Sequence, residues 1–141
     1  MFTLSNLKKR ELPHAHILIW LNTDYKNPSS EDIDKFVSAE LPNVNTDPEG
    51  YQLIEQHMIH GPCGVDRPTN SCMKNGECSK TSARQFCCSS SVDKDGYIYI
   101  IYQRSNKNSR CILNGDIRLD NRYVVPYNLE LTKKKKGSHQ R

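Results

Sequence analysis

The sequence predicts an α+β fold in which a cysteine-rich loop is inserted between two helices and a group of short strands. Apolar residues recur at helical spacing after residue 29, and this periodicity disappears over residues 61–91. A run of alternating Tyr and Ile then begins at Tyr97. The 141 residues fit one domain, but only 35% are hydrophobic, which is low for a compact globule. We therefore expect a small core that needs a further source of stability.

Residues 1–60 are expected to form one strand and two helices. The strand is the apolar segment "LPHAHILIWL" at residues 12–21. Ser29 or Ser30 is expected to cap the first helix, because acidic residues follow in the first turn. The apolar residues of this helix are Ile33, Phe36, Val37 and Leu41, and Pro42 ends the pattern.

The second helix is expected to start at Thr46. Thr46 and Glu49 have the spacing of a capping box, and Pro48 suits an early helical position. The apolar stripe consists of Tyr51, Ile54 and Met58. Residues 61–91 form the cysteine-rich loop, in which Gly, Pro, Ser, Asn and Cys replace any apolar periodicity.

Residues 92–128 are expected to add strands to the same domain. The segment "YIYIIY" at residues 97–102 is a good strand, and Asn114-Gly115 lies between two strand-like pieces, which is a hairpin signal. "RYVVPYN" is read as a last short strand interrupted by Pro126. Residues 129–141 are expected to be a basic, disordered tail.

The net charge of +4 depends on this tail, since residues 1–132 carry 15 basic against 16 acidic residues. Lys133, Lys134, Lys135 and Lys136 are weak candidates for contacts with DNA phosphates. The chain contains no apolar run of roughly 18 residues, so a membrane-spanning protein is not expected. The absence of a secretory signal favours a reducing compartment, although a secreted disulfide protein is a remaining alternative.

The six cysteines therefore favour metal binding over disulfides. Zinc binds four Cys or His ligands in a tetrahedron, and the first choice here is His60, Cys63, Cys72 and Cys78. Alternates are His57 in place of His60, and Cys87 or Cys88 as the fourth ligand. The nearby basic residues, which could contact phosphates without sequence preference, are Lys74, Lys80 and Arg84.

His14 and His16 are a second candidate metal site. Residues i and i+2 of a strand face the same side, so the two imidazoles point together and suit a divalent ion such as Mn²⁺, Mg²⁺, Co²⁺ or Zn²⁺. Such a pair leaves coordination positions open for substrate oxygens. An H-x-H pattern also arises by chance in a chain with five histidines, so spacing alone leaves both interpretations open.

The wider phrase "KKRELPHAHILIWL" resembles the metal-binding motif of the HUH endonucleases, and more narrowly the replication-initiator domain of Helitron rolling-circle transposons, often called the Helitron helicase-like domain. The resemblance continues through "DIDKFVSAELPNVNTDPEGYQLIEQHMIHGPCG", "CMKNGECSK" and "LDNRYVVPYN", and covers roughly residues 8–128. It implies a fragment of an HUH-type antiparallel sheet.

The activity that the resemblance implies is nicking and joining of single-stranded DNA. A tyrosine attacks the phosphodiester while Mn²⁺ or Mg²⁺ on His14 and His16 activates the phosphate. The family's tyrosine motif has no counterpart here, because Tyr123 and Tyr127 match a structural block, and Glu11 stands where a small residue is expected. We therefore expect a domain truncated at both ends that does not cut DNA by itself.

Two other interpretations stay open at this point: a zinc-stabilised nucleic-acid-binding module without catalysis, and a decayed transposon remnant without activity. No phosphate-binding loop of the G-x-x-x-x-G-K-[ST] type occurs, so an ATP-dependent helicase segment is expected only in a longer parent protein. The expected partner is single-stranded DNA, and the expected location is the nucleus.

Overall fold

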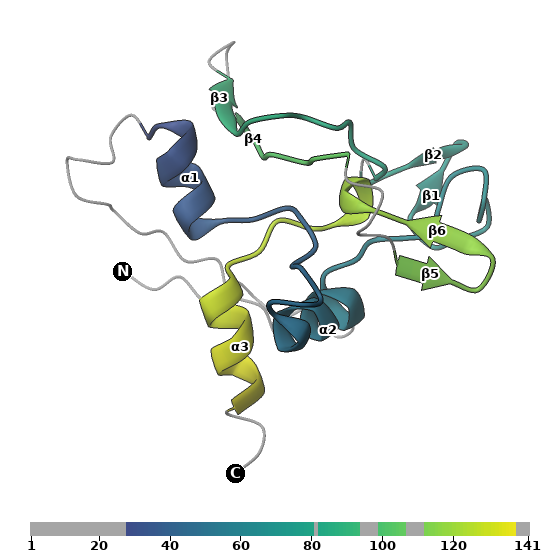
Figure 1. The fold of residues 1–141 in the computed structure, drawn as a ribbon. Coiled ribbons are helices and arrows are strands. Elements are labelled where there is room, and N and C mark those ends of the chain that lie inside the picture. Colours follow the sequence, from purple (N-terminus) through teal and green to yellow (C-terminus); the bar gives the residue numbers. More distant parts are fainter. Residues whose placement is uncertain (1–27, 81, 94–98, 107–111, 138–141) are drawn as a thin grey trace, which may run out of the picture.

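The computed structural model describes residues 28–80, 82–93, 99–106 and 112–137 (Figure 1). Its helices are α1 (Ser30–Phe36), α2 (Pro48–His57) and α3 (Leu129–Gly137), with a 3-10 turn η2 (Asn121–Tyr123). The strands form antiparallel pairs: β1 (Met73–Lys74) with β2 (Glu77–Cys78), β3 (Ser91–Asp93) with β4 (Tyr99–Ile101), and β5 (Ile112–Asn114) with β6 (Ile117–Leu119). The α+β class is confirmed.

An HUH-type sheet stays a prediction. The strand pairs above form three separate two-stranded sheets within the described ranges. The expected first strand, residues 12–21, lies outside those ranges. Isolated β-bridges link the described segments. Two of them pair Ser38 with Tyr127 and Ile59 with Val124. The segment "RYVVPYN" therefore pairs as expected with extended backbone, but at single positions on either side of Pro126 rather than as a continuous strand.

The helix α1 begins where the sequence predicts and ends early. Ser29 is the N-cap, and its side chain and that of Asp32 satisfy each other's backbone N–H groups in a capping box. The expected extension toward Leu41 is wrong, because the main chain of Ser38 instead exchanges two hydrogen bonds of 2.9 Å with Tyr127. Phe36 is consequently 46% exposed, whereas Leu41 reaches the core from a loop.

The helix α2 is capped by Asp47 and not by Thr46. The carboxylate of Asp47 accepts a 3.0 Å hydrogen bond from the backbone N–H of Gly50, and Pro48 occupies the first turn as expected. A Cβ at residue 50 would clash with the carboxylate of Asp47, so a larger residue there would displace this capping group. Ile54 is fully buried. Tyr51 and Met58, the other residues of the predicted stripe, are partly buried and pack against the core.

The helix α3 occupies most of the segment for which the sequence predicts a disordered tail. The Asn128 side chain accepts a 2.9 Å bond from the N–H of Leu131 at its start. The ammonium group of Lys133 lies 2.8 Å from both carboxylate oxygens of Asp47, which joins α3 to α2 (Figure 1). Each helix in the described ranges is too short or too polar to cross a membrane.

The apolar core is small and lies between α2, the β5–β6 hairpin and the segment that follows η2. Its buried members are Leu41, Ile54, Ile112, Leu119, Val124 and Tyr127. The predicted hairpin is confirmed, but its turn is Gly115-Asp116, one residue later than Asn114-Gly115, because Asn114 still pairs with Ile117. Gly115 has φ 66°, a conformation that Gly adopts without strain. The core is therefore built from a few side chains contributed by distant parts of the chain.

A buried polar network lies next to this core. The guanidinium of Arg104, only 3% exposed, donates from Nη1 to the carbonyl oxygens of Ala39, Asn121 and Val124 at 3.3, 2.7 and 2.7 Å. The amide of Asn121, 1% exposed, accepts from the N–H of Leu41 at 2.8 Å and donates to a carbonyl of residue 105 at 2.9 Å. These bonds satisfy main-chain groups that burial would otherwise leave without partners.

The cap and the ion pair at Asp47 can be separated by substitution. Asp47→Asn keeps a good N-cap but loses the charge, so we expect a loss of about 0.5 kcal/mol in the free energy of unfolding. Asp47→Ala also removes the cap and should cost about 1 kcal/mol more. Urea denaturation of the metal-loaded protein measures both, and equal losses for the two variants would contradict the assignment.

The same carboxylate gives a pH dependence. The Lys133 ammonium, followed by the Gly50 N–H, holds the pKa of Asp47 below its usual value of 3.8. A lowered folded-state pKa means that its stabilisation is present above pH 3.8 and is lost as the pH falls through the lower folded value. Asp47→Asn should therefore unfold with a shallower decline in stability below that pH than the unsubstituted chain.

Removal of the Arg104 side chain should be far more damaging than removal of an exposed arginine. Arg104→Met keeps much of the length but leaves three buried carbonyls without this donor, and we expect a loss of about 3 kcal/mol or more. Arg118→Met, on the exposed face of β6, should change stability by less than about 0.5 kcal/mol. Thermal and urea unfolding compare the two, and similar losses would count against the network.

Candidate metal centre

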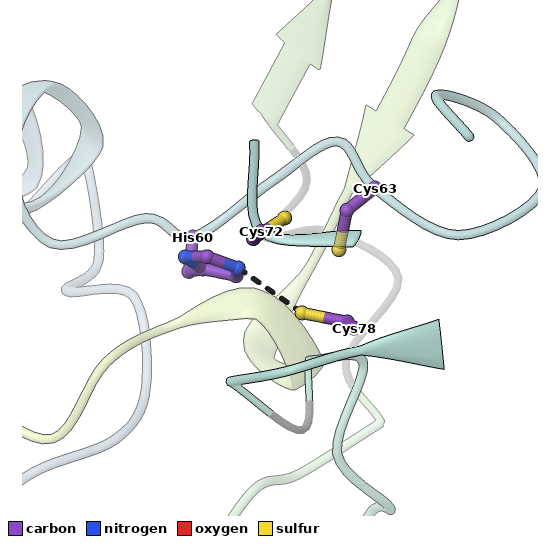
Figure 2. A group of neighbouring side chains, drawn as sticks. All are labelled: His60, Cys63, Cys72 and Cys78. Carbon is purple, nitrogen blue, oxygen red and sulfur yellow. Dashed lines mark hydrogen bonds between the residues drawn. The ribbon is translucent and has the colours of Figure 1, made fainter. Parts of the chain in front are cut away.

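Four side chains from three places in the chain converge on one point beside η2 (Figure 2). The donor atoms of His60, Cys63, Cys72 and Cys78 all lie within 4.8 Å of one another. These are the four residues that the loop spacing predicts as first choice. They lie close enough together to bind a metal ion.

His60 follows the end of α2 and is held by its own backbone. Its N–H donates to the carbonyl of Tyr123 at 2.9 Å, and its carbonyl accepts from the hydroxyl of Ser82 at 2.9 Å. The ring nitrogen Nε2 then lies 3.3 Å from the sulfur of Cys78 (Figure 2). The ring is thus placed by contacts with both the segment after η2 and the segment after β2.

Cys72 and Cys78 flank the β1–β2 hairpin. Asn75 and Gly76 have φ values of 52° and 82°, the positive values of a type I′ turn, in which Asn-Gly is a preferred pair. This tight turn reverses the chain, so that Met73 pairs with Cys78 and the Ser79 N–H donates to the Cys72 carbonyl at 2.8 Å. Both thiols therefore approach the same point from the open end of one hairpin.

Cys63 lies at the base of the centre and is 6% exposed. The turns that lead from it to the hairpin are fixed by main-chain bonds from Asn70 to Arg67 and from Met73 to Asn70. The Asn70 amide also donates to the carbonyl of Pro62. A segment without apolar periodicity is thereby held by polar contacts around the four donor atoms.

The surroundings of Cys78 and Cys63 shift the pKa values of these two thiols in opposite directions. Backbone N–H groups of Ser82 and Lys80, with the ring of His60, lower the pKa of Cys78 to about 6. Burial raises the pKa of Cys63 to about 11, and its thiol shares a hydrogen bond with Cys78. N–H groups aimed at sulfur also orient and stabilise thiolate ligands of a metal. The centre is therefore prepared for negative charge at Cys78.

The donor geometry fits a tetrahedral ion with small adjustments. Zn–S bonds of about 2.3 Å and Zn–N bonds of about 2.0 Å place the donors of a tetrahedron roughly 3.5–3.8 Å apart. The Nε2–Sγ separation of 3.3 Å between His60 and Cys78 is already close to that value. The remaining separations, all within 4.8 Å, need to shorten by at most about 1 Å.

The alternate ligands lie elsewhere. Cys87 bridges to Arg104, and its thiol donates to the Ser89 carbonyl at 3.1 Å, whereas Cys88 is exposed. His57 is exposed at the end of α2. The described cysteines, at positions 63, 72, 78, 87 and 88, are free thiols.

The other predicted site residues fall into two groups. His14 and His16 lie outside the described residues, so the divalent-metal pair stays a prediction. Lys133–Lys136 lie on α3, where Lys133 pairs with Asp47.

The chain matches no known protein-family model, and no curated protein is significantly similar to it. The function of the centre must therefore be argued from its own chemistry.

Sequence reasoning missed the donors that surround the sulfurs. Ser82 and Lys80 act through their backbone N–H groups on Cys78, and Ser82 also through its hydroxyl on the His60 carbonyl. A backbone donor has no residue signature, so only the path of the chain identifies it. The nearest signal is the spacing, because Lys80 and Ser82 lie two and four residues after the predicted ligand Cys78.

Substitution of a ligand should remove metal binding, whereas substitution of a neighbouring free cysteine should not. We expect Cys78→Ser to weaken zinc affinity by more than about 100-fold, since even the loss of an outer partner costs 10- to 100-fold. Cys88→Ser is the matched control. Chelator competition with Zn²⁺ measures the affinities, and Co²⁺ absorption reports thiolate ligation. Unchanged binding by Cys78→Ser, or equal loss in the control, would contradict the assignment.

Proposed function

We propose that the chain is a zinc-stabilised module that binds single-stranded DNA, and that it corresponds to the metal-retaining part of a Helitron-type replication-initiator domain. The observation that supports a zinc-stabilised module is the convergence of His60, Cys63, Cys72 and Cys78. The second half rests on the sequence resemblance over roughly residues 8–128. On this proposal the module acts in the nucleus, beside a helicase segment of a longer parent protein.

Zinc is the ion that this donor set favours. Thiolate and imidazole ligands in a tetrahedron select Zn²⁺, whereas Mg²⁺ and Mn²⁺ prefer carboxylate, carbonyl and water oxygens. A centre with four protein ligands has no open position for a substrate, so its role is structural. In the described part of residues 60–82, regular structure is limited to the four residues of β1 and β2, and a metal would supply the folding free energy that the small core lacks.

A role in DNA binding is supported by the position of the basic residues. Lys80 and Arg84 follow the last zinc ligand, on a segment whose backbone is tied to the centre and to η2. Positive side chains on such an ordered platform contact phosphates without the entropy cost of ordering a flexible loop. The proposed substrate, single-stranded DNA, comes from the resemblance.

Strand cutting by Tyr123 or Tyr127 is disfavoured by their surroundings. Tyr127 is 6% exposed, packs in the core, and donates its hydroxyl to the carbonyl of Glu40 at 2.7 Å. Burial raises the pKa of Tyr123, which disfavours the phenolate needed for attack on phosphorus. The alternative function, a metal-dependent nicking and joining enzyme, would therefore require a nucleophile other than Tyr123 or Tyr127.

Two assays on one preparation test the proposal. Zinc-loaded protein should bind fluorescent single-stranded DNA with an affinity that falls with salt, by about 0.7 log units per log unit of salt for each phosphate contacted. With Mn²⁺ and end-labelled DNA, a denaturing gel should show no covalent adduct.

Each outcome has a distinct meaning. Folded, zinc-loaded protein that fails to bind DNA would refute the binding module, and a chain that does not fold with zinc would indicate a decayed remnant. An adduct that disappears in the His14→Ala/His16→Ala double variant would instead establish the enzyme. Tyr123→Phe and Tyr127→Phe would then show whether either residue is the nucleophile.

A further inference from the structure

The three sulfur ligands of the metal centre differ in their hydrogen bonds. The sulfur of Cys78 accepts from the backbone N–H of Lys80 at 3.4 Å and from the backbone N–H of Ser82. It also lies 3.3 Å from Nε2 of His60 (Figure 2). Two main-chain dipoles therefore point at this sulfur and stabilise negative charge on it.

The sulfur of Cys63 is protected mainly by burial. This residue is 6% exposed, and the hydroxyl of Ser82 is within hydrogen-bonding reach of its sulfur. A reagent dissolved in water reaches a buried atom only when the surrounding segment opens locally. Cys63 is therefore shielded by its position at the base of the centre.

Cys72 has neither kind of protection. Its side chain is partly exposed, and the residues before it, Asn70 and Ser71, lie on the surface. The neighbouring N–H of Ser79 donates to the carbonyl of Cys72, at 2.8 Å, and not to its sulfur. Within the described segments the Cys72 sulfur has no hydrogen-bond donor. Among the three ligands, this sulfur thus combines access from solvent with the fewest hydrogen bonds.

Bound zinc would turn this difference into a difference of reactivity. A thiol that coordinates zinc is deprotonated by the ion, so all three sulfurs would be thiolates in the loaded centre. Their order of reactivity is then set by access and by hydrogen bonding, because a donor bonded to a thiolate stabilises the electron pair that would otherwise attack. Both properties select Cys72 as the ligand that reacts first with an electrophile.

We propose that Cys72 is a site of reversible oxidation by peroxides, and that its oxidation releases the metal. The Cys72 thiolate attacks one peroxide oxygen, so that an S–O bond forms, the O–O bond breaks and hydroxide leaves. The thiolate of Cys63 or Cys78, each within 4.8 Å, then attacks the oxidised sulfur, forms a disulfide and releases a second hydroxide. Two protons from solvent convert the hydroxides to water, and the peroxide gains the two electrons that the sulfurs lose.

The disulfide leaves too few ligands for the metal. His60 and one cysteine remain, whereas a closed zinc site needs four donors. The segment of Lys80 and Ser82, which is bonded to the Cys78 sulfur and the His60 carbonyl, then loses the ion that holds it in place. The inference rests on the zinc-stabilised module proposed above. It adds that a thiol reductant and fresh zinc restore that module, because a disulfide is reversible.

Labelling of the zinc-loaded chain tests the order of reactivity. The parent protein carries Cys87→Ser and Cys88→Ser, which remove free thiols outside the centre and keep all four ligands. A substoichiometric amount of N-ethylmaleimide is added, and mass spectrometry of the peptides locates the modified ligand. Cys72 should be labelled before Cys63 and Cys78. First labelling at either of the other two ligands would overturn the inference.

A matched pair of variants tests the release of the metal. Cys72→His and Cys78→His each keep four zinc ligands in the same parent, and a chromogenic chelator follows zinc release by hydrogen peroxide. Cys72→His should slow release roughly tenfold, the lower end of the effect of an outer hydrogen bond at a metal site, whereas Cys78→His should not slow it. Equal slowing, or a loaded parent that keeps its zinc in peroxide, overturns the inference alone. A parent that binds no zinc refutes the proposed module as well, and if a histidine variant does not load, the labelling order decides.

Discussion

The guanidinium of Arg104 joins three stretches of backbone that are far apart in the sequence. It binds carbonyls at residue 39, after α1, and at residues 121 and 124, around η2. Asn121 extends the same network to the N–H of Leu41. Burial of an arginine without a directly bonded carboxylate costs free energy unless its donors are satisfied, and here carbonyl oxygens satisfy them. The network thereby fixes the path of residues 121–127 through the middle of the molecule.

The metal centre depends on that path. The carbonyl of Tyr123, one residue before Val124, accepts the N–H of His60 and so positions the histidine ligand. The carbonyl of Arg122 accepts the N–H of Arg84 and so positions the segment that returns from Cys78. Two distant parts of the loop are therefore attached to one short turn, and the four donor atoms meet beside it. The polar network, together with a metal bound by these four donors, would replace the large apolar core that the composition does not allow.

Local chemistry is the part of this structure that the sequence could predict. Ser29 with Asp32, a hairpin between Ile112 and Leu119, and the spacing of Cys72 and Cys78 all act within a few residues, and the structure contains each of them. The early end of α1 could not be predicted, because the competing partner of Ser38 is Tyr127, far along the chain. The helix α3 was missed for a similar reason. Its lysine-rich sequence indicates disorder by composition, and its contact with Asp47 depends on tertiary placement.

The two metal sites of the proposed domain have ligand sets that suit different tasks. Zinc outranks Mn²⁺ for nitrogen ligands in intrinsic affinity, so an imidazole pair such as His14 and His16 would not by itself exclude it. A closed centre with three sulfur ligands has a far stronger preference for zinc, and it offers no open position for a phosphate. On the proposed function, a scissile phosphate would be activated at the histidine pair, whereas the closed centre would have a structural role. Binding and cutting of DNA would then depend on different metal sites, and a chain could retain the first without the second.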